Sequence, residues 1–263
     1  SRQWIWEQYD HMVQSNTVVG PGSDAAVVRI KGTKKALAMT LDGPAYRVAR
    51  NPREGAKMAV AEACRNIVCS GGRPVAATNC LNFGNPEHPE VMWQFSEVVN
   101  GMSEACAYLG TPITGGNVSF YNETFGEDIY PTPVLGMVGL IEDVAFVTTS
   151  SFRETGDSIV LVETVNRLTG SVNLDDERAI QGFVSAAIRD KLICSAHDVS
   201  EGGLAVALAF ENRQRDLGVV RVLDGAFEQE PMALLHVIGL LVMYFSKSPQ
   251  LLQKNMRLIG MNM

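Results

Sequence analysis

Apolar and polar positions recur at two different spacings along the first part of the chain. Short apolar runs at 27–30 and 36–41 flank "KGTKK", which is typical of a β-hairpin with Gly32 in its turn. Across residues 51–72, apolar positions recur every three to four residues, which predicts a helix. Asn51 suits the N-cap of this helix, Pro52 suits its first position, and two glycines mark its end.

The same spacings predict further elements over the rest of the chain. The patterns indicate strands at 74–78, 134–140, 158–162 and 193–195, and helices at 89–109, 175–191 and 204–210. A polar stretch at 147–157 separates two such groups, so we expect domains at 1–149 and 150–263. Strands alternate with helices in both domains, which predicts an α/β (α+β) architecture.

Composition narrows the class of protein. Hydrophobic residues make up 46% of the 263 positions, which is normal for a globular chain. The net charge of −7, without any run of basic residues, argues against nucleic acid as a partner. The apolar stretch 232–245 is shorter than the roughly 20 residues that span a membrane, and the first ten residues lack the apolar core of a signal peptide. Five cysteines without C-x-x-C spacing fit a reducing compartment, so we expect a cytoplasmic location and no membrane partner.

The segment "TPITGGNVSFYNE", residues 111–123, carries candidate chemistry. Gly115 and Gly116 would let the backbone approach a ligand closely. The side-chain oxygen of Asn117 is a hard ligand suited to Mg²⁺, and the hydroxyl of Ser119 can donate to a phosphate oxygen. The alternative is a simple β-turn, because Gly, Asn and Ser are the usual turn residues. The segment alone leaves both possibilities open.

Two carboxylates stand at predicted strand ends. Asp24 precedes a strand in "GPGSDAAVV", and Asp42 ends one in "MTLD", so the two could share one metal ion. Turn chemistry for Asp24 and solvent exposure for Asp42 explain the positions equally well. His197 and Asp198 are interpreted as part of a glycine-ended loop, "HDVSEGG", because adjacent residues do not orient each other as members of a catalytic triad.

Four stretches together resemble one family. They are "QYDHMVQSNTVVGPGSDAAVV", "EACRNIVCSGGRPVAATNCLNFGNPE", "GTPITGGNVSFYNE" and "SAHDVSEGGLAVAL". They resemble the synthetase subunit of phosphoribosylformylglycinamidine synthase, and the resemblance covers about residues 1–212. This family converts formylglycinamide ribonucleotide to its amidine with ATP and with ammonia from a glutaminase partner. Each half of its synthetase chain has a barrel-forming N-terminal domain and a C-terminal α/β domain of the aminoimidazole ribonucleotide synthetase-like fold.

The resemblance also implies roles for individual residues. Asn79 and Gly116 match ATP contacts, Asn117 matches a Mg²⁺ ligand, and Ser119 matches a contact to the substrate at its ribose phosphate. Asp24 and Asp42 match acidic positions that bind metal in the wider superfamily. In this half of the synthetase they would serve a second, auxiliary nucleotide site.

The chain resembles only the second half of the synthetase. The catalytic His of the family and most of its metal carboxylates belong to the other half, so the isolated chain is expected to be inactive. The resemblance implies pairing with that N-terminal half, or a homodimer, through the first domains. The chain is shorter than the family between residues 162 and 174, and the resemblance fades from 227 to 263.

Two other functions remain open. The chain could be another enzyme of the superfamily, a cyclo-ligase or a small-molecule kinase, although "LNFGNPE" together with "GGNVSFYNE" argues against this. It could also be a non-catalytic scaffold that binds a nucleotide and Mg²⁺ for stability.

Overall fold

The computed structural model describes residues 3–153, 158–163, 171–200, 203–204, 206–208 and 240–245. Its largest element is a six-stranded sheet in the order β1-β2-β3-β8-β4-β5. The strands are β1 (Thr17–Val19), β2 (Ala26–Arg29), β3 (Ala36–Asp42), β8 (Thr132–Ile141), β4 (Arg73–Asn82) and β5 (Ile113–Ser119). All neighbours pair antiparallel except β4 and β5, which are parallel. The sheet therefore has β1 and β5 as its edges.

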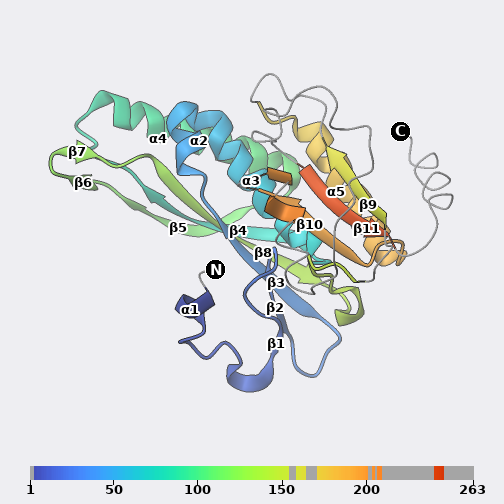
Figure 1. Cartoon of the computed structure of the whole chain (residues 1–263). Coiled ribbons are helices and arrows are strands. Elements are labelled where there is room, and N and C mark those ends of the chain that lie inside the picture. The colour runs from blue at the N-terminus through green and yellow to red at the C-terminus, as the bar shows by residue number, and fades with distance from the viewer. Residues whose placement is uncertain are drawn as a thin grey trace.

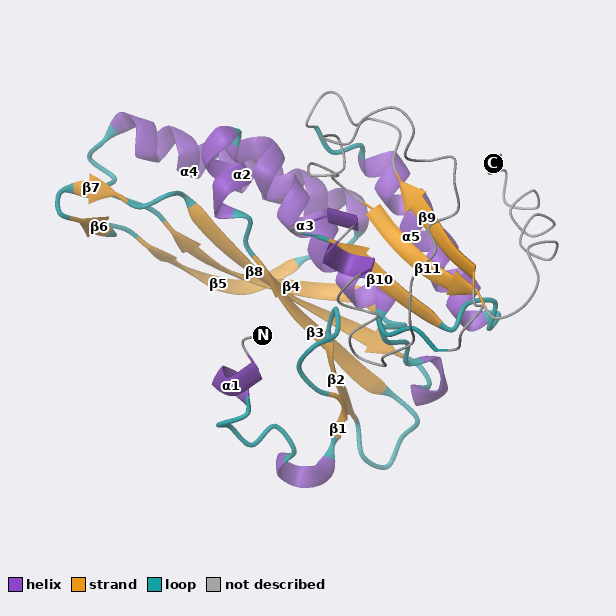
Figure 2. Cartoon of the chain, viewed as in Figure 1, coloured by secondary structure: helices purple, strands orange, loops and turns teal. Residues whose placement is uncertain are grey.

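Three helices lie along one face of this sheet (Figures 1 and 2). They are α2 (Ala45–Arg50), α3 (Pro52–Cys69) and α4 (Pro89–Leu109). The predicted N-cap is confirmed, since the Asn51 side chain accepts a hydrogen bond from the backbone N–H of Glu54 at 3.3 Å. Helix α4 ends at Gly110, whose left-handed φ of 73° suits a residue without a Cβ atom. The fully buried Ile67, Leu135 and Met137 belong to the core between the sheet and the helices.

A second, smaller sheet lies beside the C-terminal end of α3. It has the order β10-β11-β9, with β10 at Ser195–Val199, β11 at Leu240–Phe245 and β9 at Ser158–Glu163. Helix α5 (Leu174–Arg189) packs with this sheet, and Val68 and Cys69 of α3 contribute to the same core. Helix α3 is therefore shared between the two layers, which holds the predicted domains together.

Short elements complete the described chain. They are α1 (Gln3–Trp6), the 3-10 helix η1 (Val13–Ser15), β6 (Glu123–Thr124), β7 (Glu127–Asp128) and the 3-10 helix η2 (Val144–Phe146). Strands β6 and β7 form a separate hairpin. None of the helices in the described residues has the length and apolar character that crossing a membrane requires.

The mixed α/β architecture, the hairpin of β2 and β3, and helices α3, α4 and α5 confirm the sequence predictions. The predicted strands 74–78 and 134–140 lie inside the longer β4 and β8. The predicted helix 204–210 is described only at 204 and 206–208, which are helical, and the rest lies outside the described residues. Residues 154–157 of the proposed domain boundary, and all of 227–263 except β11, also lie outside them.

The structure decides one open alternative and contradicts one prediction. The glycine-rich segment, for which a β-turn had remained possible, is a strand, because Gly115, Gly116 and Asn117 lie within β5. His197 and Asp198 lie within β10, whereas a loop was expected and the strand was placed at 193–195. Both strands contain residues that are unusual in strands, and both depend on tertiary partners for their conformation.

Candidate nucleotide and metal sites

The parallel pair β4–β5 brings together the four residues that the sequence assigned to ATP, Mg²⁺ and substrate. Asn79 is paired with Gly116 across the two strands, Cys80 with Asn117, and Asn82 with Ser119. Ser119 and Asn82 are the last residues of their strands, so the carboxyl ends of both strands meet at one point. Ligands of α/β proteins commonly bind at the carboxyl ends of parallel strands.

Gly116 has to be a glycine because of Asn79. A Cβ atom on Gly116 would lie 2.7 Å from the backbone oxygen of Asn79 and closer still to its side-chain oxygen. Gly115, by contrast, has no atom within 4 Å of its equivalent position. The Nδ2 of Asn79 also contacts the sulfur of Met102 on α4 at 3.5 Å, so this side chain points toward the helices.

Asn117 and Ser119 are two residues apart in β5, so they share one face of the strand and Gly116 faces the other way. Every residue from Ile113 to Val118 is exposed, and Ser119 is half-buried. Because β5 is an edge strand, a ligand placed along it can contact both faces. The strand therefore offers a backbone free of side chains at Gly115 and Gly116, beside an amide and a hydroxyl.

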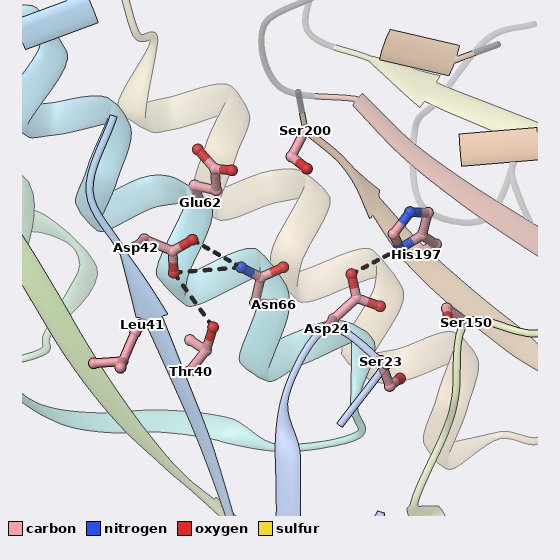
Figure 3. Close-up of a pocket in the computed structure, with 11 residues that line it drawn as sticks. Ser23, Asp24, Thr40, Leu41, Asp42, Glu62, Asn66, Ser150, His197 and Ser200 are labelled. Atoms are coloured by element: carbon pink, nitrogen blue, oxygen red, sulfur yellow. Dashed lines mark hydrogen bonds and ion pairs between the residues drawn. The ribbon is translucent and has the colours of Figure 1, made fainter. Parts of the chain in front are cut away.

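A separate cavity of about 390 Å³ contains Asp24 and Asp42. It is also lined by Gly22, Ser23, Thr40, Leu41, Glu62, Asn66, Ser150, His197 and Ser200 (Figure 3). Asp42, the last residue of β3, accepts hydrogen bonds from the Nδ2 of Asn66 at 3.2 and 3.3 Å and from the hydroxyl of Thr40 at 3.4 Å. Solvent exposure alone does not account for Asp42, which is half-buried.

Asp24 is almost fully buried at the other side of this cavity. Its side chain is 3% exposed, and its Oδ1 accepts from the Nδ1 of His197 at 2.8 Å and from the backbone N–H of Asp198 at 3.1 Å. Its Oδ2 is buried and has no hydrogen-bond partner in the part of the chain that the structure describes. A buried carboxylate oxygen without a partner is costly, and a cation is one group that would satisfy it.

Burial disfavours the ionised form of two carboxyl groups in the cavity, those of Asp42 and Glu62. Burial raises the pKa of Asp42 to about 6. Burial, together with the charge of Asp198, raises the pKa of Glu62 to about 7. The described residues that line the cavity include no lysine or arginine, and their carboxylates, amide and hydroxyls are the hard oxygen donors that Mg²⁺ prefers. The residues present therefore fit a divalent cation.

A buried ion-pair network lies behind the cavity. Arg65 of α3 donates from Nε to Asp198 of β10 at 2.6 Å and from Nη1 to Glu177 of α5 at 2.7 Å, with all three side chains at most 7% exposed. This network joins α3 to α5 and β10, and it explains why the polar Asp198 is compatible with a buried strand.

The two groups of predicted residues are not one metal site. Asp42 and Asn79 both pair with Leu135 of β8, from opposite sides, and Asn79 pairs in turn with Gly116. Asp42 and Gly116 are thus separated by three strand-to-strand steps across the sheet. At the usual spacing of strands, their backbones are about 14 Å apart. One ion cannot bind Asn117 together with Asp24 and Asp42, because metal–oxygen distances are about 2.0–2.6 Å.

Sequence reasoning missed the helical side of the cavity. Glu62, Arg65 and Asn66 are polar residues on one side of α3, whose remaining residues from Gly55 to Cys69 are largely buried and apolar. Polar residues three and four positions apart in a helix of this kind indicate a shared polar environment, and this signal could have found them. His197, Ser150 and Ser200 come from distant parts of the chain and carried no such signal.

Residues 22–141 match the model of a family described as AIR synthase related protein, N-terminal domain. Over 95% of its length, the chain is similar to solved structures of PurL from Thermotoga maritima. One is described as the structure of PurLQS, with 25% identity, 95% of this chain and 39% of the other covered, and a TM-score of 0.75. PurL complexed with AMPPCP has 25% identity, 95% and 39% coverage and a TM-score of 0.70. PurL complexed with FGAR has 25% identity, 95% and 37% coverage and a TM-score of 0.72.

These similarities have a clear limit of length. The chain spans about two-fifths of the PurL chains that it matches. The resemblance inferred from the four sequence stretches is confirmed as a similarity: residues 22–141 match the AIR synthase related N-terminal domain, and 95% of the chain is similar in fold to PurL.

Proposed function

We propose that this chain is part of an ATP-dependent carbon–nitrogen ligase that converts formylglycinamide ribonucleotide to formylglycinamidine ribonucleotide in purine biosynthesis. The observation that carries the proposal is the β4–β5 pair, which gathers Asn79, Gly116, Asn117 and Ser119 on two adjacent strands. The PurL structures with AMPPCP, an analogue of ATP, and with FGAR support the same nucleotide and the same substrate.

The residues of β4 and β5 have distinct roles in this proposal. Asn79 and the bare backbone at Gly116 contact ATP, and the Ser119 hydroxyl donates a hydrogen bond to the substrate phosphate. The side-chain oxygen of Asn117 is the ligand for Mg²⁺, which when bound neutralises phosphate charge. In the reaction, ATP phosphorylates the amide oxygen of the substrate, and ammonia from glutamine then displaces phosphate. Positioning and charge neutralisation supply most of the catalysis in phosphoryl transfer.

We propose a different role for the cavity of Asp24 and Asp42, namely an auxiliary site for Mg²⁺ and a nucleotide. The buried Oδ2 of Asp24 without a partner is the observation that favours it. Asn66 and Glu62 add to the donor set. Binding here would stabilise the contact between β10 and the segment that contains Asp24. The Oδ1 of Asp24 already lies 2.8 Å from the Nδ1 of His197 on β10.

The proposal includes partners. The face of the six-stranded sheet opposite α3 carries apolar side chains of β3, among them Met39 and Leu41, which are 38% and 74% exposed. Exposed apolar faces and free strand edges favour association, so we propose that this face and the sheet edges pair with a preceding synthetase half or with a second copy. A glutaminase subunit would supply ammonia, and we place the assembly in the cytoplasm.

A turnover assay separates this proposal from a purely structural nucleotide-binding role. The longer synthetase polypeptide in which we propose this chain lies should form the amidine from formylglycinamide ribonucleotide, ATP and ammonia. The 263-residue chain by itself should not exceed a control without enzyme, because the catalytic His is expected in the other half. Absence of turnover by the longer polypeptide, in a preparation that binds ATP, would favour the scaffold.

A further inference from the structure

Asn122 lies at the turn that follows β5, and its polar groups connect three segments. Its Nδ2 donates to the carbonyl oxygen of Phe83 at 2.9 Å, to the carbonyl oxygen of Ser119 at 3.0 Å and to the hydroxyl of Ser119 at 3.1 Å. Its backbone N–H donates to Phe83, and its backbone oxygen accepts from Ile129. One side chain therefore ties the ends of β4 and β5 to each other.

The backbone around Asn122 is held in a conformation that allows these contacts. Tyr121, between Ser119 and Asn122, has a φ of 58°, in the left-handed region that residues with a Cβ atom rarely adopt. The N–H of Tyr121 donates to the carbonyl of Gly84 at 2.8 Å, and the N–H of Phe83 donates to that of Ser119 at 2.9 Å. Surrounding structure usually imposes strain of this kind, and it clusters at functional sites.

The orientation of the Asn122 amide follows from its partners. Its nitrogen faces two backbone carbonyl oxygens, and the flipped amide would place an oxygen against both of them. The nitrogen has two hydrogens and three acceptors, so one N–H is shared between two of them, and the Ser119 hydroxyl accepts through one of its lone pairs at 3.1 Å. The hydroxyl has one hydrogen, which has only a longer contact of 3.4 Å with the Asn122 side-chain oxygen. That hydrogen is available to a stronger acceptor such as a phosphate oxygen.

We infer that Asn122 is a positioning residue that orients the Ser119 hydroxyl as hydrogen-bond donor to the phosphate group of the ribonucleotide substrate. The inference rests on the proposed function, in which Ser119 contacts this substrate. In this inference Asn122 acts on the substrate through the Ser119 hydroxyl, to which its side chain donates.

The test is a double-mutant cycle in the longer synthetase polypeptide. Binding of formylglycinamide ribonucleotide is measured by calorimetry for the wild type, Ser119→Ala, Asn122→Ala and the double variant. Ser119→Ala should weaken binding on the order of tenfold, as expected for a hydrogen bond to a charged group. Asn122→Ala should have a similar effect, and the double variant should bind no worse than Ser119→Ala, because both changes remove the same hydrogen bond.

The substrate without its phosphate group, formylglycinamide riboside, provides the readout that a merely structural role would not give. Its affinity should be the same in the wild type and in Asn122→Ala, and the KM for ATP should not change. Asn100→Ala, on the exposed side of α4, is the matched control. If Asn122→Ala does not fold, Asn122→Asp preserves the size of the side chain and removes its donors, and should also lose phosphate-dependent affinity.

The outcomes separate the inference from the proposed function. If Ser119→Ala leaves ribonucleotide binding unchanged, or the wild type does not bind it, the proposed substrate contact is wrong and the inference fails with it. Two results would overturn the inference alone, provided that Ser119→Ala weakens ribonucleotide binding. One is a double variant whose loss of affinity equals the sum of the two single losses. The other is an Asn122→Ala variant that loses as much affinity for the riboside as for the ribonucleotide.

Discussion

Asn79 and Gly116 face each other across the parallel β4–β5 pair, and the Asn79 side chain occupies the space that a Cβ atom on residue 116 would need. Gly116→Ala should therefore displace Asn79 and destabilise the fold by roughly 1–3 kcal/mol, as overpacking does. ATP affinity should fall as well, because both of these proposed contacts move. Urea unfolding and ATP titration measure the two effects.

Gly115→Ala is the control for this prediction, because its added methyl group meets no atom within 4 Å. Its stability should be unchanged or slightly higher, since alanine restricts the unfolded chain. Equal destabilisation by the two substitutions would show that the contact with Asn79 is not what requires a glycine at 116.

The buried Arg65 is predicted to be essential for joining the two domains. Arg65→Met would leave Glu177 and Asp198 buried without a cation, which should cost roughly 3–5 kcal/mol. Adding Glu177→Gln and Asp198→Asn should recover much of the loss, because the uncompensated charges are then gone. Arg29→Met, at an exposed position of β2, should have little effect in the same urea unfolding experiment. If Arg65→Met lowers the free energy of unfolding no more than Arg29→Met does, the buried network is not important for stability.

Stability should depend on pH through Glu62. Its folded-state pKa of about 7 lies above the ordinary value of 4.5, so the folded chain binds the proton more tightly than the unfolded chain. The resulting stabilisation is complete below about pH 4.5 and is lost as the pH rises through 7. Asp42, with a pKa raised to about 6, acts in the same direction. Without divalent cations, the unfolding temperature should therefore fall between pH 5.5 and pH 8.

Glu62→Gln should flatten this pH dependence, whereas Glu127→Gln, on the exposed β6–β7 hairpin, should preserve it. Mg²⁺ should raise stability more at pH 8 than at pH 5.5, because it binds ionised carboxylates. A pH profile identical in Glu62→Gln and the wild type, or a Mg²⁺ effect that is larger at low pH, would show that this cavity does not couple protons to a cation.

Self-association should depend on the apolar sheet face. The chain alone should form dimers at high concentration, and Leu41→Lys should shift it toward the monomer, because a charge there opposes burial of the face. Phe125→Lys, on the hairpin of β6 and β7, is the control for a general effect of charge on an exposed apolar residue. Light scattering that finds a wild-type monomer at high concentration would remove the proposed pairing through this face.

Local signals predicted much of this fold. Asn51, Pro52 and the helical spacing of apolar residues defined α3 to within a few residues, and Gly110 marked the end of α4. These elements were predictable because caps and periodicity are short-range properties. Asp24 and Asp42, which the sequence suggested as one metal-binding pair, both line one cavity, and their binding of a metal ion stays a prediction.

The remaining features depend on contacts between distant parts of the chain. Strand β5 contains two adjacent glycines and is stabilised by pairing with β4, so no local propensity indicated it. His197 and Asp198 are compatible with β10 because Asp24 and Arg65 provide their partners, and those partners lie more than 130 positions away in the sequence. Local patterns cannot predict such pairs.

The central claim is that β5 binds ATP through Mg²⁺ at Asn117, and calorimetric titration of ATP with and without Mg²⁺ tests it most directly. The measurement compares the wild type with Asn117→Ala, in the chain joined to the preceding half that we propose. Asn117 is exposed, so the variant should fold normally, and its affinity for ATP should fall only when Mg²⁺ is present. An unchanged Mg²⁺-dependent affinity in the folded variant would contradict the account.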